Sequence, residues 1–107
     1  MHTHGKVDKH QPELLKVLSA NGIPYVVISD LGNGRPDLIV RMPVRCLKCK
    51  SGANQNVMVE LKTGDAKLTP DEVEWHDKHP GMAVIWRTYR HGKQLIVTDD
   101  KGKLITF

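Results

Sequence analysis

The feature that constrains the fold most is the segment 37–42, which is almost entirely apolar after its first residue. Apolar side chains on both faces predict a central strand of a sheet that is covered on both sides. A second β-rich segment, 57–62, follows after a stretch containing both cysteines and several turn-forming residues. Its alternation places Glu60 and Lys62 on the face opposite to that of Leu61. These two segments predict neighbouring strands of one sheet.

Two helices are expected around this strand pair. The first covers residues 8–21, with Asp8 as its N-cap and a hydrophobic stripe on one face. The second starts after the N-cap Thr69 and runs to about Lys78, because Pro70 and Glu72 complete a capping box. Tryptophans 75 and 86 are expected in the core. The other expected segments are a flexible start at 1–7, strands at 23–29, 82–88 and 95–98, a loop at 31–36, a long hairpin connection at 43–56 and a short edge at 104–107.

The element order α-β-β-β-α-β, followed by a small hairpin, predicts one α/β domain over residues 1–107 with a mixed central sheet flanked by helices. The chain carries 16 Lys and Arg against 12 Asp and Glu, a net charge of +4, which suits a polyanionic partner such as DNA. No apolar run approaches the length of a membrane span, and the first residues lack the apolar stretch of a signal peptide. Two cysteines make no disulfide framework. We therefore expect a cytoplasmic protein without a membrane partner.

Asp37, Glu60 and Lys62 form the combination with the clearest chemistry. Antiparallel pairing would bring Asp37, at the start of one strand, beside Glu60, near the end of the other. Two adjacent carboxylates repel unless a cation lies between them, and Mg²⁺ or Mn²⁺ suits their oxygen atoms. Such an ion activates water for attack on a phosphodiester, with Lys62 orienting the water or neutralising developing charge. Glu13, at the edge of the first helix, is a candidate for a further ligand. Taken singly, each charge is more typical of a solvated surface.

The sequences Gly34-Arg35-Pro36-Asp37-Leu38-Ile39-Val40 and Val57-Met58-Val59-Glu60-Leu61-Lys62 together resemble the PD-(D/E)XK nuclease signature. Within that superfamily the chain resembles the stand-alone viral replication and repair nuclease (VRR-NUC) domains of phages and bacteria. The likeness extends over most of residues 8–90. It departs from the family at Glu72, where glutamine is frequent, and in the longer connection that holds the cysteines.

The resemblance implies a restriction-endonuclease-like fold and a Mg²⁺- or Mn²⁺-dependent endonuclease in a bacterial or phage-infected cell. Asp37, Glu60 and the backbone carbonyl of Leu61 would hold the metal, Lys62 would be catalytic, and Glu13 would be the helix-borne acid. Similarity to Holliday-junction resolvases implies a homodimer that acts on branched DNA.

Several further cations are candidates for contacts with DNA phosphates, which position a protein without reading sequence. They are Arg35, Arg45, Lys48, Lys50, Lys67, Arg87 and Arg90. Two other functions stay open: a DNA-binding module of the same fold that does not cleave, and an interaction domain stabilised by zinc at Cys46 and Cys49. Zinc normally takes four ligands, and a second cysteine pair is absent from the sequence.

Overall fold

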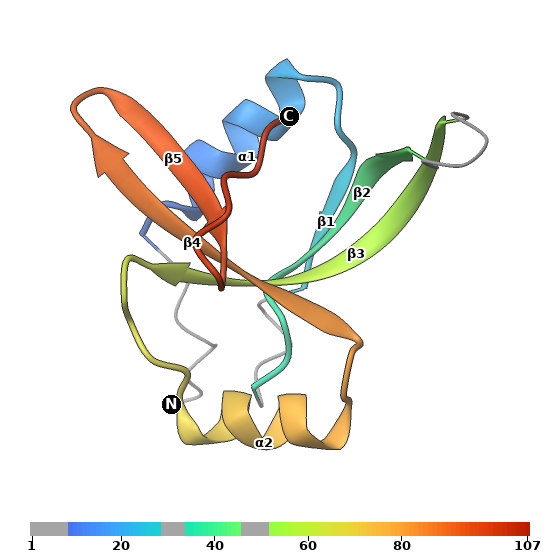
Figure 1. Cartoon of the computed structure of the whole chain (residues 1–107), viewed down its shortest axis with the longest axis vertical. Helices are drawn as coiled ribbons and strands as arrows, with labels where there is room; N and C mark the ends of the chain where they lie inside the picture. The colour runs from blue at the N-terminus through green and yellow to red at the C-terminus, as the bar shows by residue number, and fades with distance from the viewer. Residues whose placement is uncertain (1–8, 29–33, 46–51) are drawn as a thin grey trace.

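One five-stranded mixed sheet runs through the molecule, with one helix on each of its faces (Figure 1). The computed structural model describes residues 9–28, 34–45 and 52–107. Its elements are α1 (Gln11–Ala20), β1 (Tyr25–Val27), β2 (Leu38–Arg45), β3 (Gly52–Thr63), α2 (Pro70–Lys78), β4 (Ala83–His91) and β5 (Gln94–Asp99). The predicted α/β class with a mixed sheet is therefore confirmed. No helix in the described ranges is long and apolar enough to cross a membrane.

The strands follow the order β1-β2-β3-β4-β5, and only β3 and β4 run parallel. β2 and β3 pair antiparallel, as the sequence predicted, and the register places Leu38 opposite Val59. Parallel neighbours need a long crossover, and α2 supplies it between β3 and β4. This topology brings the start of β2 and the end of β3 together on the face of the sheet that α2 covers.

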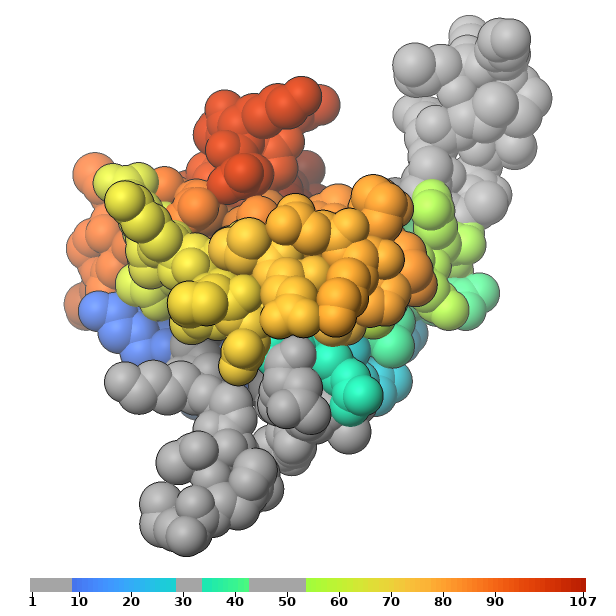
Figure 2. Space-filling view, turned by 90° about the horizontal axis from the view of Figure 1, so that it is seen from below, coloured from blue at the N-terminus to red at the C-terminus, as the bar shows by residue number. Residues whose placement is uncertain are grey.

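The hydrophobic core lies between α1 and the sheet. Leu14 and Leu18 of α1 are fully buried against alternating apolar residues of the strands. Trp86 belongs to this cluster, as predicted. The prediction that Trp75 lies in the core is wrong, because Trp75 is only half-buried and α2 has no buried residue. Glu72 and His76, which α2 directs at the sheet, are polar, and this helix contributes no buried residue to a second apolar core. Seen from its own side, α2 lies across the middle of the molecule (Figure 2).

The predicted hairpin connection at 43–56 is too long, because β2 continues to Arg45 and β3 already begins at Gly52. Residues 54–56 are polar and exposed, so their side chains show no hydrophobic pattern of a strand. Backbone pairing with β2 nevertheless places them in β3. Pro43 is compatible with β2 for a geometric reason. The Arg41 N–H donates to the Pro24 carbonyl, which precedes β1, so Arg41 makes the last hydrogen bond between β2 and this segment. Because backbone groups alternate in direction, the Pro43 nitrogen faces the same side, beyond the end of β1, where no N–H is needed for pairing.

Smaller differences occur at the other ends. α1 is shorter than the predicted helix 8–21, and β1 is shorter than the predicted strand 23–29. The expected edge at 104–107 is reduced to one bridge between Thr98 and Leu104. The Asp99 side chain accepts from the backbone N–H groups of Lys101 and Lys103 and closes the turn that precedes this bridge. The flexible start at 1–7, the N-cap Asp8 and part of the predicted loop 31–36 lie outside the described residues.

Candidate active site beneath helix α2

Asp37 is held at the start of β2 by the backbone of the neighbouring strand. Its N–H donates to the Val59 carbonyl at 2.9 Å, and its Oδ2 accepts from the Leu61 N–H at 2.7 Å. Its own carbonyl accepts from the Ile28 N–H, which ties the same residue to the end of β1. With 7% of its surface exposed, Asp37 is a buried carboxyl group in a fixed orientation. The predicted meeting of Asp37 with the 60–62 segment is therefore present.

Glu60 is buried more deeply and is less well satisfied. Its exposed fraction is 1%, and neither carboxylate oxygen has a hydrogen-bond partner in the described part of the chain. Burial, followed by contact with the Asp37 carboxyl and the charge of Glu72, raises the pKa of Glu60 from 4.5 to about 10. Burial also raises the pKa of Asp37, against the lowering effect of its bonds. An unsatisfied buried carboxylate is costly, so these two groups form a site that favours a proton or a cation.

Lys62 lies two residues further along β3 and therefore on the same face as Glu60. Its Nζ lies 2.5 Å from Oε1 of Glu72 on α2, and the side chains of Lys62 and Glu72 are 14% and 15% exposed. The same Oε1 accepts from the Thr69 N–H at 2.8 Å, while the Glu72 N–H donates to Thr69 Oγ1, which completes the predicted capping box. Burial would raise the pKa of Glu72, but its bonds to Lys62 and Thr69 lower it. Glu72 thus links the helix start to the lysine.

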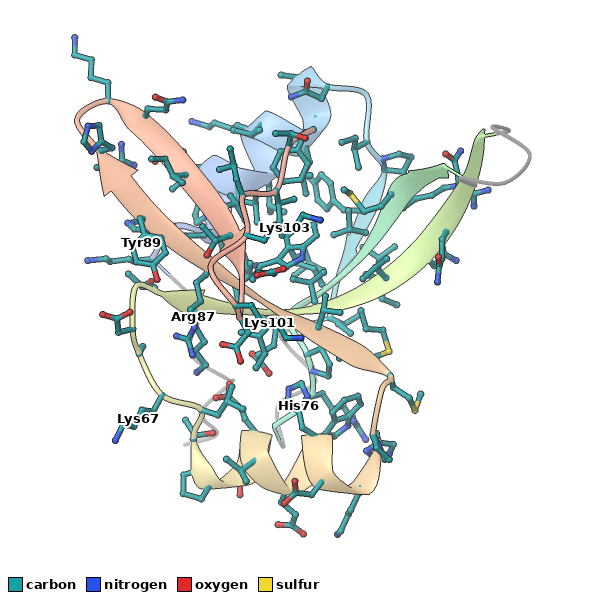
Figure 3. All side chains as sticks on the ribbon, viewed as in Figure 1. Lys67, His76, Arg87, Tyr89, Lys101 and Lys103 are labelled. Carbon is teal, nitrogen blue, oxygen red and sulfur yellow. The ribbon has the colours of Figure 1, made fainter. Side chains whose placement is uncertain are left out.

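His76 also belongs to this site, although no motif in the sequence marks it. It lies one helical turn after Glu72 and extends from α2 toward the sheet (Figure 3). Its Nε2 lies 3.7 Å from Glu60 Oε1, and this nitrogen is buried without a hydrogen-bond partner among the described residues. The i, i+4 spacing of Glu72 and His76 was the available signal, because residues so spaced share one face of a helix.

The Asp37 segment and α2 approach each other closely at Gly34. This residue has φ of 75°, and a Cβ atom built on it would overlap the backbone carbonyl of Asp71. Only glycine combines this conformation with such a close approach at little cost. Gly34 therefore helps to fix the distance between the carboxylates and the first turn of α2.

Glu13 is not brought together with Asp37 and Glu60. It lies on α1, which covers the opposite face of the sheet, and forms an ion pair with Arg90 of β4. Within the described ranges, no three His, Cys, Asp or Glu side chains gather as a metal site. The same ion pair engages Arg90, another of the predicted phosphate contacts.

The other predicted DNA contacts have different surroundings. Arg35 is exposed and forms no ion pair with any described residue, and Lys67 points away from α2 and the sheet (Figure 3). Arg87 instead ties the β3–α2 connection to the sheet, because it donates to the Gly64 and Ala66 carbonyls and to Asp100. The side chains of Arg45, Lys48 and Lys50, like Cys46 and Cys49, lie outside the described part.

The donor set of the site suits a hard divalent cation. Glu60 offers two oxygens without partners, and Asp37 keeps one oxygen beyond that bonded to Leu61. Mg²⁺ is usually bound through one or two carboxylates and several waters, so two carboxylates are sufficient protein ligands. No family model matches the chain, and no curated protein or solved structure is significantly similar to it. The function has to be inferred from the site itself.

Proposed function

We propose that this chain is a divalent-metal-dependent DNA endonuclease whose centre consists of Asp37, Glu60 and Lys62. The observation that carries the proposal is the buried carboxylate pair, in which neither oxygen of Glu60 has a hydrogen-bond partner in the described structure. A pair of this kind is unfavourable in its charged form unless a cation lies between the two groups. A lysine on the same face, held by an acidic residue, adds the positive group that phosphodiester chemistry needs.

Asp37 and Glu60 would hold a Mg²⁺ or Mn²⁺ ion together with the backbone carbonyl of Leu61. The Leu61 N–H points toward Asp37, and the carbonyl of a strand residue points to the same side as its N–H. The ion would supply a Lewis acid that polarises a phosphate oxygen and lowers the pKa of a bound water.

Lys62 contributes charge and orientation. Its ammonium group would donate to a non-bridging phosphate oxygen or to the attacking water, and would stabilise the negative charge that develops during attack. Glu72 positions this ammonium group from the first turn of α2. Because Glu72 is also held by the helix cap, the lysine is restrained before substrate arrives, which reduces the entropy lost on reaction.

The sequence resemblance and the observed element order support a restriction-endonuclease-like arrangement of the PD-(D/E)XK type, close to VRR-NUC domains. The order α-β-β-β-α-β, the antiparallel β2–β3 pair and the acidic groups where these strands meet are compatible with that arrangement. Homodimer formation and a preference for branched DNA belong to the same proposal, and they rest on the resemblance.

The test compares wild type with Lys62→Ala on a labelled four-way junction and a linear duplex of the same sequence, each with Mg²⁺, Mn²⁺ or EDTA. We expect metal-dependent cutting by wild type, and loss of cutting with retained DNA binding in Lys62→Ala. Lys16→Ala is the matched control, since this lysine is exposed on α1, which covers the face of the sheet opposite to the site. If wild type binds both DNAs and cuts neither with any metal, the chain is a binding module and the hydrolytic function is refuted.

A further inference from the structure

A pocket lies beside the candidate active site, between the segment before β2 and one side of α2. Its volume is about 420 Å³, within the range of roughly 300–1,000 Å³ that is usual for small-ligand pockets. It is lined by Arg35, Asp71, Glu74, Trp75, Lys78 and His79. Two of its lining residues are close in sequence to residues of the site. Arg35 stands two residues before Asp37, and Trp75 precedes His76, which approaches Glu60.

Two aromatic rings form a fixed platform in this pocket. The Trp75 indole and the His79 imidazole are stacked, with centroids 4.3 Å apart and planes inclined by 21°. His79 is held by a hydrogen bond of its Nδ1 with the Trp75 carbonyl at 2.8 Å. Trp75 is only half-buried, and it keeps surface in the lining of the pocket beside its contacts with His79 and His76. A platform ordered in advance reduces the entropic cost of stacking a ligand on it.

The charges in the pocket favour a nucleobase inside and a phosphate outside. Asp71 and Glu74 are acceptors and would repel a phosphate group placed next to them, but they can accept hydrogen bonds from the amino and imino groups of a base. Lys78 is already engaged by Glu74 at 2.7 Å. Arg35 is the lining cation without an ion pair in the described structure, and its exposed guanidinium can take a backbone phosphate at the rim.

We propose that this pocket binds an unpaired nucleobase of the DNA strand that Asp37 and Glu60 receive. The inference rests on the proposed nuclease function and names its substrate class. A base inside a duplex is covered on both faces by its neighbours and cannot reach an aromatic platform without being extruded. The substrate is therefore DNA with an unpaired nucleotide next to the cleaved phosphate, as at a flap, a gap or a single-stranded end.

The test asks whether the contribution of one DNA base to binding depends on the Trp75 side chain. A labelled single-stranded pentanucleotide is titrated in EDTA, with each base replaced in turn by an abasic site, and binding is followed by fluorescence anisotropy. For wild type we expect one position at which loss of the base weakens binding by about 5- to 150-fold, the usual range for base–aromatic stacking. Trp75→Leu should bind the intact strand more weakly by a similar factor and should no longer respond to the abasic site.

Three further variants keep the test independent of folding defects. Trp75→Tyr and His79→Ala should melt near the wild-type temperature, with the first retaining the base effect and the second reducing it. Val73→Ala is the control, because Val73 is 44% exposed on α2 and does not line the pocket. A base effect that persists unchanged in Trp75→Leu and His79→Ala, or that is absent from wild type at every position, overturns the proposal.

Failure of the pocket and failure of the nuclease give different results. Wild type that shows the base effect but cuts no DNA with Mg²⁺ or Mn²⁺ retains the nucleotide pocket and refutes hydrolysis. Wild type that cuts junction and duplex DNA equally, without any base effect, retains hydrolysis and refutes the pocket.

Discussion

Replacing Glu60 with glutamine should stabilise the metal-free protein at neutral pH, and the effect should grow with pH. Glu60 is buried with its pKa raised from 4.5 to about 10, so the folded protein keeps a proton that the unfolded chain releases. Stability from this group is fully present below pH 4.5 and is lost as pH rises toward 10. Glu60→Gln places a neutral isostere there and removes this dependence.

The magnitude follows from proton linkage. Each pH unit between the unfolded and folded pKa values changes the free energy of unfolding by about 1.4 kcal/mol for one proton. At about pH 7.5, roughly three units above the unfolded value, the wild type should be less stable than Glu60→Gln by about 4 kcal/mol. This is a large part of the 5–15 kcal/mol that holds a typical domain together.

Urea unfolding in EDTA, from about pH 5 to pH 9, measures this difference directly. Wild type and Glu60→Gln share the other ionisable groups, so their difference isolates the Glu60 contribution and its immediate contacts. We expect the curves to meet near pH 5 and to separate steadily above it. A difference that stays constant over this range would refute the reasoning, because it would mean that Glu60 ionises in the fold as it does in water.

Three other perturbations have defined outcomes. Mn²⁺ affinity, measured by calorimetry, should rise with pH by up to about tenfold per unit, because binding releases the Glu60 proton, and Asp37→Asn should abolish binding; a pH-independent affinity contradicts this. Glu72→Gln should change the free energy of unfolding by less than about 1 kcal/mol, since it keeps the cap oxygen, whereas Glu72→Ala should cost about 1 kcal/mol more. If denaturant unfolding gives the same loss of free energy of unfolding for Glu72→Gln and Glu72→Ala, a capping contribution from the Glu72 side chain is excluded. Gly34→Ala should lower the free energy of unfolding clearly more than Gly92→Ala, for which we expect a loss of about 1 kcal/mol. Both glycines have positive φ, but only Gly34 faces a backbone carbonyl at close range. Equal midpoints of thermal unfolding for the two variants would contradict the close approach.

The strand pair that brings Asp37 and Glu60 together could be predicted from the sequence. Alternation along 57–62 fixes which side chains share a face, and a turn-rich connection that forms a hairpin gives the antiparallel direction. Asp37 before an apolar strand then has to lie near the other strand's end. These are local rules, and the observed register with Leu38 opposite Val59 agrees with them.

The residues that α2 contributes could not be predicted in the same way. A helix whose inward face is polar has no hydrophobic stripe to mark its orientation, so the sequence pattern indicates a capping role for Glu72 and no specific role for His76. For the same reason Trp75 was expected in the core. Which face of α2 meets the sheet depends on the β3–α2–β4 crossover, a long-range property of the chain.

The ion pairs of Glu13 and Arg87 were hidden for a related reason. Each charged residue has a partner that is distant in sequence, Arg90 for the first and Asp100 for the second. A long charged side chain that forms such a pair has the same sequence pattern as one that faces a ligand. Only the packing of α1 and of the β4–β5 hairpin decides between the two.

Pro43 has a consequence for association between chains. β2 and β3 continue past the start of β1, so the outer edge of β2 there has no partner strand among the described residues. Bare strand edges are templates on which other chains can add and aggregate. Because Pro43 has no N–H to offer on that side, an incoming strand would lose a hydrogen bond at this position. A residue that resembles a strand breaker in the sequence therefore makes strand addition at this edge less favourable.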